Sequence, residues 1–179
     1  MSTATRSEDQ RVTTEIREPT LDDVEALGRM HHASWVESYE PLLPAEFWSG
    51  FEPENRIAVW RRILGSPHPA LRTAVAVVDG AIAGVAHAGP GTDGEGDAYP
   101  AVRETQLDIL YVLRAHQGTG VAQQLLEAVL PPGTPAQLWV FERNPRARRF
   151  YERNGFQLDG TRHVFGPELG HQPEIRLVR

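Results

Sequence analysis

The sequence predicts an α/β protein with a mixed central sheet and helices on both faces. Extended and helical patterns alternate along the chain, which favours layers of helices packed on a sheet. Asp79-Gly80 lies between two apolar runs, as in a two-residue β-hairpin. An apolar run near 105–113 leads through glycines into a helical pattern, and no internal repeat is evident.

Composition indicates one compact domain over residues 12–179, preceded by a polar tail at 1–11. No apolar run approaches a membrane span, and the start of the chain lacks the apolar core of a signal peptide, so we expect a cytoplasmic protein without a membrane partner. The net charge of -6 argues against nucleic-acid binding. The absence of cysteine excludes disulfides and an acyl-cysteine intermediate.

The first half of the chain predicts a strand, two helical regions and a hairpin. Gly89 to Pro100 contains four glycines and two prolines and should form a mobile loop. The expected elements are a strand near 12–18, helices within 20–37 and 53–65, and hairpin strands at 71–78 and 81–88, joined by a type I′ turn.

The second half predicts alternating strands and helices. Pro131 to Gly133 breaks the chain after the first of these helices. The expected elements are strands near 105–113, 137–141, 156–165 and 173–178, with helices at about 119–130 and 145–154.

The first functional motif is Gln117-Gly118-Thr119-Gly120-Val121-Ala122, at the junction of strand and helix. Glycine permits positive φ and close approach to the main chain, and a helix N-terminus presents free N–H groups, so the motif predicts an anion cradle. The alternative is a simple turn. Gln123 replaces the third glycine of a dinucleotide fingerprint, and no Gly-Lys-Ser/Thr of a P-loop follows.

The second motif runs from Asn144 to Phe156. Asn144 followed by proline is typical of a helix N-cap, and Gly155 suits the end of that helix. Tyr151 lies on the apolar face of the helix, where an ordinary core tyrosine is the alternative to a functional one.

The two motifs together resemble the GNAT superfamily of N-acetyltransferases, and the similarity covers nearly all of the chain after residue 12. The resemblance implies a mostly antiparallel sheet of about seven strands, the GNAT-like acyl-CoA N-acyltransferase fold. It also implies transfer of an acetyl group from acetyl-CoA, as co-substrate and without a metal, to a primary amine of a small molecule, peptide or protein.

The resemblance further implies roles for single residues. Backbone groups of Leu110, Tyr111 and Val112 would meet the coenzyme, although a buried strand explains them equally well. Tyr151 would protonate the leaving thiolate. The coenzyme-binding set is Leu110, Tyr111, Val112, Gln117, Gly118, Thr119, Gly120, Val121, Ala122 and Asn144, and Asn144 could equally be only a cap.

The general base is less defined by the sequence. Gln106 stands where several family members have glutamate, and glutamine cannot accept a proton. Asp108, two residues on and therefore on the same strand face, is the candidate base or a solvated carboxylate. His87 and Glu40 are weaker candidates.

The acceptor pocket is expected near Trp35 and Tyr39, which share a helical face and could also be core residues. The segment from Asp93 to Tyr99 would add acidic groups and favour a cationic amine. The histidines, including adjacent His31 and His32, predict no metal site.

The role of an arginine run and the kind of activity both stay open. A run of arginines is either a solvated face or a contact with coenzyme phosphates: Arg143, Arg146, Arg148, Arg149 and Arg153. The alternatives to the enzyme are a noncatalytic acyl-CoA sensor and an N-acyltransferase for longer acyl groups. Exposed strand edges would permit a homodimer.

Overall fold

The computed structural model describes residues 13–93 and 99–179 and contains a seven-stranded mixed sheet, as predicted. The strand order is β1-β2-β3-β4-β5-β7-β6, and only β4 and β5 pair in parallel. The expected tail at 1–11 lies outside the described residues. The strands are β1 (Thr14–Arg17), β2 (Arg72–Val78), β3 (Ala81–Pro90), β4 (Thr105–Val112), β5 (Gln137–Phe141), β6 (Gln157–Val164) and β7 (Pro173–Val178).

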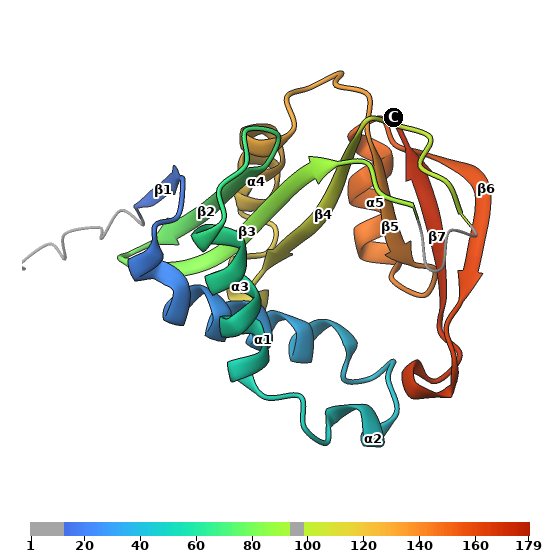
Figure 1. The fold of residues 1–179 in the computed structure, drawn as a ribbon, viewed down its shortest axis with the longest axis horizontal. Coiled ribbons are helices and arrows are strands. Elements are labelled where there is room, and N and C mark those ends of the chain that lie inside the picture. Colours follow the sequence, from blue (N-terminus) through green and yellow to red (C-terminus); the bar gives the residue numbers. More distant parts are fainter. Residues whose placement is uncertain (1–12, 94–98) are drawn as a thin grey trace, which may run out of the picture.

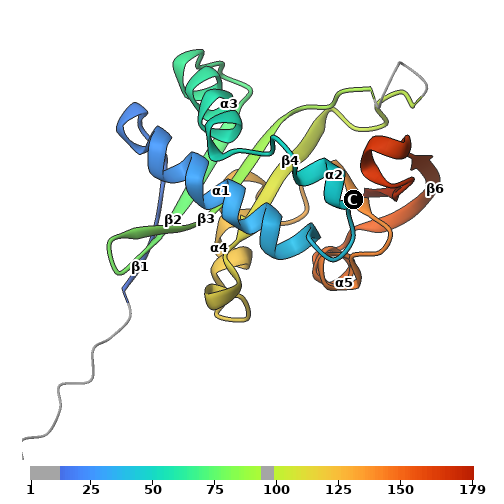
Figure 2. The ribbon, with the colours of Figure 1, turned by 90° about the horizontal axis from the view of Figure 1, so that it is seen from below.

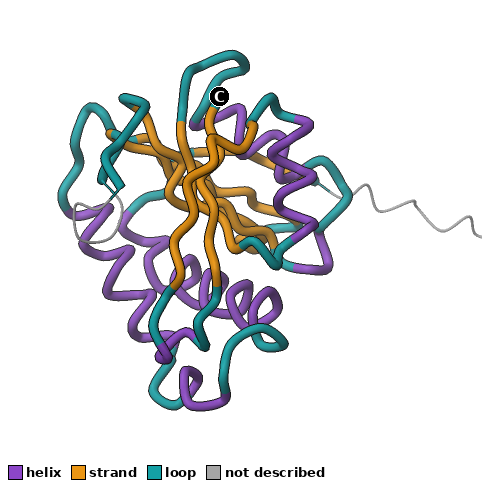
Figure 3. The backbone as a smooth tube through the Cα atoms, turned by 90° about the vertical axis from the view of Figure 1, so that its right-hand side faces the viewer, coloured by secondary structure: helices purple, strands orange, loops and turns teal. Residues whose placement is uncertain are grey.

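Helices cover both faces of this sheet (Figure 3). The α-helices are α1 (Val24–Tyr39), α2 (Ala45–Trp48), α3 (Pro53–Gly65), α4 (Val121–Val129) and α5 (Pro145–Arg153). Short 3-10 turns are η1 (Leu21–Asp23), η3 (Arg114–His116) and η4 (Pro167–Leu169). No helix in the described part of the chain is long and apolar enough to cross a membrane.

The two faces have separate cores. Leu27 of α1 and Trp60 of α3 pack with Val75 and Val85 on one face. The other face packs against α4 and α5 through a larger cluster that includes Leu125. Helix α1 therefore lies across the opposite face from α4, as Figure 2 shows.

The predicted hairpin is confirmed. Asp79 and Gly80 have φ values of 48° and 84°, as the two central residues of a type I′ turn require. Strand β3 continues through Pro90, although a loop was expected from Gly89. Gly89 and Pro90 pair with Gln106 and Thr105 of β4, so the ladder extends the strand.

Strands β4 and β5 separate soon after they meet. Their one paired position is Gln106 with Gln137, and the strands then diverge (Figure 1). Beyond that pair, the edge of β4 that faces β5 has no strand partner. This divergence opens the sheet where the two sequence motifs meet.

The short helix α2 was not expected from the sequence. It has only one turn, from Ala45 to Trp48, and hydrophobic periodicity cannot be read over four residues. Its aromatic side chains pack in a cluster beside Trp35.

Candidate active site

A cavity of about 730 Å³ lies at the divergence of β4 and β5. Residues from α1, β4, β5, α5 and β7 and from the loop before α4 line it. Of the predicted site residues, those that line it are Trp35, Tyr39, Asp108, Leu110, Tyr111, Val112, Gln117, Gly118, Gly120, Ala122, Asn144 and Tyr151.

The loop before α4 forms one part of the cavity wall, and its lining residues are Gln117, Gly118, Gly120 and Ala122. Gly118 and Gly120 have φ values of 83° and 90°, which L side chains rarely adopt. Among the described residues, no acceptor takes a hydrogen bond from the backbone N–H groups of 118–122. The loop therefore presents a row of free donors at the start of α4, suited to an anion.

Side chains of the same loop hold its shape. The Gln117 amide donates to the carbonyl of Val112 at 2.9 Å, and the Thr119 hydroxyl donates to the carbonyl of His116 at 2.7 Å. Thr119 and Val121 do not line the cavity, and the Val121 side chain is in the core. These two predicted residues can therefore offer only main-chain groups.

Three arginine side chains line the cavity together with this loop. Arg114 lies on η3, and Arg146 and Arg153 lie on α5; all three line the cavity. Arg148 instead donates to the carbonyl of Glu142 at 3.3 Å. We call the loop 117–122 with Arg114, Arg146 and Arg153 the coenzyme end, after the role that the sequence predicts for the loop.

Three tyrosines meet in the middle of the cavity. The Tyr39 and Tyr111 hydroxyls are 3.1 Å apart. Burial raises the pKa of Tyr151, and the nearby Tyr39 raises it further. A buried phenol of raised pKa keeps its proton at neutral pH, so Tyr151 can serve as a proton donor.

Asn144 has the capping role expected of it. Its side-chain oxygen accepts from the N–H of Ala147 at 3.1 Å at the start of α5. The same residue lines the cavity, where burial raises the pKa of Tyr39 and the nearby Asn144 side chain partly opposes that rise. Capping and a cavity position are therefore compatible.

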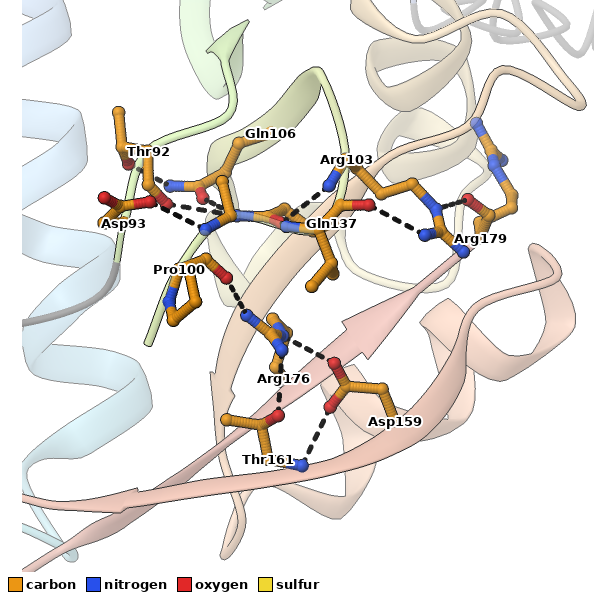
Figure 4. Close-up of polar contacts among 12 residues, drawn as sticks. Thr92, Asp93, Pro100, Arg103, Gln106, Gln137, Asp159, Thr161, Arg176 and Arg179 are labelled. Carbon is orange, nitrogen blue, oxygen red and sulfur yellow. Dashed lines mark hydrogen bonds and ion pairs between the residues drawn. The ribbon is translucent and has the colours of Figure 1, made fainter. Parts of the chain in front are cut away.

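Gln106 and Gln137 belong to a polar network that joins the two strands at their meeting point (Figure 4), and Asp108 is connected to it through Gln106. The buried Gln137 donates to Gln106 at 2.7 Å, and Gln106 donates to Asp108, also at 2.7 Å. Desolvation raises the pKa of Asp108, and the bond from Gln106 opposes that rise. A carboxylate of raised pKa is a better proton acceptor.

Strand β4 has a bulge at Asp108 that regular alternation does not predict. The pairing of β3 with β4 passes from Ile109 to Leu107 at consecutive β3 residues, so the bulge interrupts strict alternation. The Gln106 amide nonetheless bonds the Asp108 carboxylate, so the two side chains meet as expected.

The remaining cavity wall is aromatic and acidic. Asp108 and Glu174 supply carboxylates, and the apolar side chains beside them are Trp35, Trp139, Phe165 and Leu169. We call these six residues the acceptor end, after the role that the sequence predicts for Trp35. Trp35 stacks on Phe47 at a centroid distance of 5.9 Å, so it has the alternative core role as well.

The weaker base candidates lie elsewhere. His87 is buried beneath Trp60 and hydrogen-bonded to Thr73 at 2.7 Å, and burial lowers its pKa. Glu40 is exposed after the end of α1. Neither residue lines the cavity. No group of three or more His, Asp or Glu within 13–93 and 99–179 could hold a metal.

The predicted acidic segment is only partly described. Asp93 accepts from the N–H of Ala101 at 2.7 Å and does not line the cavity. Glu95 and Asp97 lie outside the described residues. Tyr99 packs edge-on against Trp139, with ring centroids 5.6 Å apart.

Sequence reasoning missed Glu37, Trp139, Phe165 and Glu174. Glu37 accepts from the N–H of Arg114 at 2.7 Å, which places it beside the coenzyme end. Glu174 reaches the cavity because β7 lies between β5 and β6. No motif marks it, since sheet order alone brings it there.

The split sheet and the glycine loop define the acyl-CoA N-acyltransferase fold, and solved structures support this assignment. An acetyltransferase from Thermus thermophilus has a TM-score of 0.63 and 24% identity, with 93% of this chain and 96% of that chain covered. PaiA N-acetyltransferase from Thermoplasma acidophilum, solved in complex with coenzyme A, has a TM-score of 0.62 and 18% identity, with 92% and 98% covered.

Sequence comparison identifies the family. The model of the acetyltransferase (GNAT) family matches residues 28–156, so the chain belongs to this family. An uncharacterized N-acetyltransferase of Mycobacterium bovis is 29% identical over 165 residues, which are 89% of this chain and 98% of that protein. A protein of the same description from Mycobacterium tuberculosis matches with the same values.

Proposed function

We propose that this protein transfers the acetyl group of acetyl-CoA to a primary amine. The observation that carries the proposal is the row of free N–H groups at 118–122, placed at one end of a cavity that also contains Tyr151. Pyrophosphate oxygens accept such donors, and the three arginines add positive charge. The pantetheine arm would lie along the unpaired edge of β4.

The proposed reaction makes one bond and breaks one. The amine nitrogen attacks the thioester carbonyl carbon, the new C–N bond forms, and the C–S bond breaks with its electron pair on sulfur. Tyr151 gives its proton to the thiolate. The nitrogen loses a proton to Asp108, directly or through water, and solvent restores both residues.

The test is release of free CoA from acetyl-CoA by the purified protein with a panel of amines, polyamines, amino acids, aminoglycosides and peptides. We expect turnover with at least one amine class. Tyr151→Phe should lower kcat about 100-fold or more and leave acetyl-CoA affinity unchanged, because it removes one proton donor. Tyr99→Phe, which removes a hydroxyl outside the cavity, is the matched control.

Tight acetyl-CoA binding without turnover of any amine would contradict the proposed transferase activity and favour a noncatalytic acyl-CoA sensor. Turnover with acyl-CoA thioesters of longer chain, in preference to acetyl-CoA, would change the donor and keep the reaction class.

A further inference from the structure

An arginine without an ion-pair partner lies beside the acceptor end. Arg56 is in the first turn of α3, and its guanidinium carbon lies over the rings of Trp35 and Phe51, at 4.6 and 5.0 Å from their centroids. Its Nε is buried and has no hydrogen-bond partner. Within residues 13–93 and 99–179, no carboxylate forms an ion pair with Arg56. A partly buried positive charge in this state favours the arrival of an anion.

Two further N–H donors near Arg56 also lack an acceptor. His31 Nδ1 accepts from the Trp60 indole at 3.0 Å, so the neutral ring carries its proton on Nε2, which is buried without a partner. Burial lowers the pKa of His31, and the charge of Arg56 lowers it further. The Trp48 indole N–H is buried and unpaired as well, and its ring packs edge-on against Phe51 at 5.2 Å. Unpaired donors of this kind suit a group that only accepts hydrogen bonds, such as a carboxylate.

Trp35 connects Arg56 with the cavity. Trp35 lines the cavity, and its ring centroid is 6.4 Å from that of Tyr111. Burial raises the pKa of Tyr111, and the charge of Arg56 opposes that rise. Arg56 itself does not line the cavity. A molecule that reaches both the tyrosines and Arg56 must therefore extend past the Trp35 side chain.

Arg56 differs from the other arginines around the cavity. The three arginines of the coenzyme end line the cavity together with the glycine loop. Arg176 of β7 bonds to Asp159 at 2.6 Å and to Thr161 at 2.9 Å (Figure 4). Arg56 therefore keeps its capacity to bind an anion from solution. A single guanidinium matches the one charge and the two coplanar oxygens of a carboxylate.

We infer that the amine acceptor also carries a carboxylate, separated from the amine by several carbon atoms, and that Arg56 binds this carboxylate. This inference rests on the proposed acetyl transfer. The amine lies at the tyrosines, the carbon chain passes Trp35, and the carboxylate accepts hydrogen bonds from the guanidinium. The rings of Trp35 and Phe51 already hold the guanidinium in place, so less conformational freedom is lost when it pairs with an anion.

The experiment compares 6-aminohexanoate with 6-aminohexanamide as acceptors. The two compounds have the same length and differ in the charge of the group far from the amine. We expect kcat/KM to favour the carboxylate by at least about 10-fold, because hydrogen bonds between charged groups are about twice as strong as neutral ones. The difference should lie in KM, since Arg56 is remote from the reacting atoms. Equal use of the two compounds would overturn the inference.

Variants assign the preference to Arg56. Arg56→Met keeps an apolar side chain on Trp35 and should reduce the ratio to about 2 or less by raising KM for the carboxylate alone. Arg56→Lys should keep a preference of at least about 3-fold, because the charge remains. Arg62→Met, at an exposed position on the same helix, is the control. A ratio unchanged in Arg56→Met, or KM values that rise equally for both compounds, would overturn the inference.

A binding measurement separates this inference from the proposed function. Calorimetric titration of the two compounds into the protein with CoA should show the same preference without any turnover, and Arg56→Met should abolish it. Selective binding of 6-aminohexanoate with no CoA release from acetyl-CoA would contradict the transferase and leave the carboxylate site standing. CoA release with other amines, together with equal binding of the two compounds or binding of neither, would overturn the inference and leave the transferase standing.

Discussion

The coenzyme end and the acceptor end of the cavity are built from different kinds of groups. The coenzyme end consists mainly of backbone N–H donors from one continuous segment, residues 118–122. The acceptor end consists of side chains from four separate regions, among them Trp35, Trp139 and Glu174. A main-chain site depends on backbone dihedral angles, whereas a side-chain site depends on residue identity and packing. Substitutions should therefore affect the two ends separately.

The largest expected effect is at the junction of β4 and β5, which both ends share. Gln137 accepts from the N–H groups of Val102 and Arg103 at 2.8 and 3.2 Å and is fully buried. Gln137→Leu would leave these two N–H donors and the side-chain oxygen of Gln106 without a partner, so we expect a loss of about 2 to 4 kcal/mol in the free energy of unfolding.

Urea denaturation measures this loss, with Gln124→Leu on α4 as the control. Because the loss would reach both ends, acceptor use and coenzyme binding should fall together. A Gln137→Leu variant with the stability, acceptor use and coenzyme binding of the wild type would show that this network does not stabilise the junction of β4 and β5.

Acid should lower the stability of the protein through the buried His31 of α1. His31 accepts from the Trp60 indole at 3.0 Å and packs against Tyr111 with ring centroids 4.9 Å apart, and burial lowers its pKa to about 3. An unfolded histidine gains a proton below about pH 6.5, whereas the folded one stays neutral, so stability falls as pH falls. Between pH 6.5 and 4.5 the loss should be about 2 to 3 kcal/mol.

The check is denaturation at several pH values. His31→Gln should flatten the slope in part, since buried His87 contributes in the same direction. His68→Gln, at an exposed position, should leave the slope unchanged. A wild-type stability that is flat over this window would exclude a buried neutral His31.

A glycine pair tests the coenzyme end alone. Gly118 and Gly133 have φ values of 83° and 80°, and a Cβ at either would have nothing within 4 Å. Alanine at either position should cost about 1 to 2 kcal/mol of stability through backbone strain. Only Gly118→Ala should weaken acetyl-CoA binding, by about 10-fold, as measured by calorimetry. Equal binding by both variants would mean that the loop does not hold the coenzyme.

The smallest effect should come from one hydroxyl group. Tyr39→Phe removes the 3.1 Å bond to Tyr111 and should cost about 1 kcal/mol of stability. We expect a change of a few-fold in KM for the amine and none in coenzyme affinity, and steady-state kinetics with each substrate varied would measure both. A change confined to coenzyme affinity would show that Tyr39 serves coenzyme binding and not amine binding.

The contrast between the two ends also explains what the sequence could predict. Gly118, Gly120 and Asn144 have roles fixed by their local backbone, so a short pattern is enough to find the glycine loop and the start of α5. Glu174 has no such local signal. Its place depends on β7 lying between β5 and β6, which is a property of the whole sheet.

Two features of the sheet show the same difference between local and long-range signals. The Asp79-Gly80 hairpin was predictable because the turn type is encoded in two residues. The bulge at Asp108 was not, because it arises from the register between β3 and β4.

The divergence of β4 from β5 has a mechanical consequence. The sheet has two parts, β1 to β4 and β5 to β7, which pair only at Gln106 and Gln137. A ligand in the cavity would contact Gly118 and Gly120 beside the first part and Asn144 and Tyr151 beside the second. Such a ligand would connect the two parts of the sheet, so its binding should raise the free energy of unfolding. At a concentration one hundred times its Kd, the gain is about 2.7 kcal/mol. The liganded protein should therefore melt at a higher temperature and resist proteases longer than the free protein.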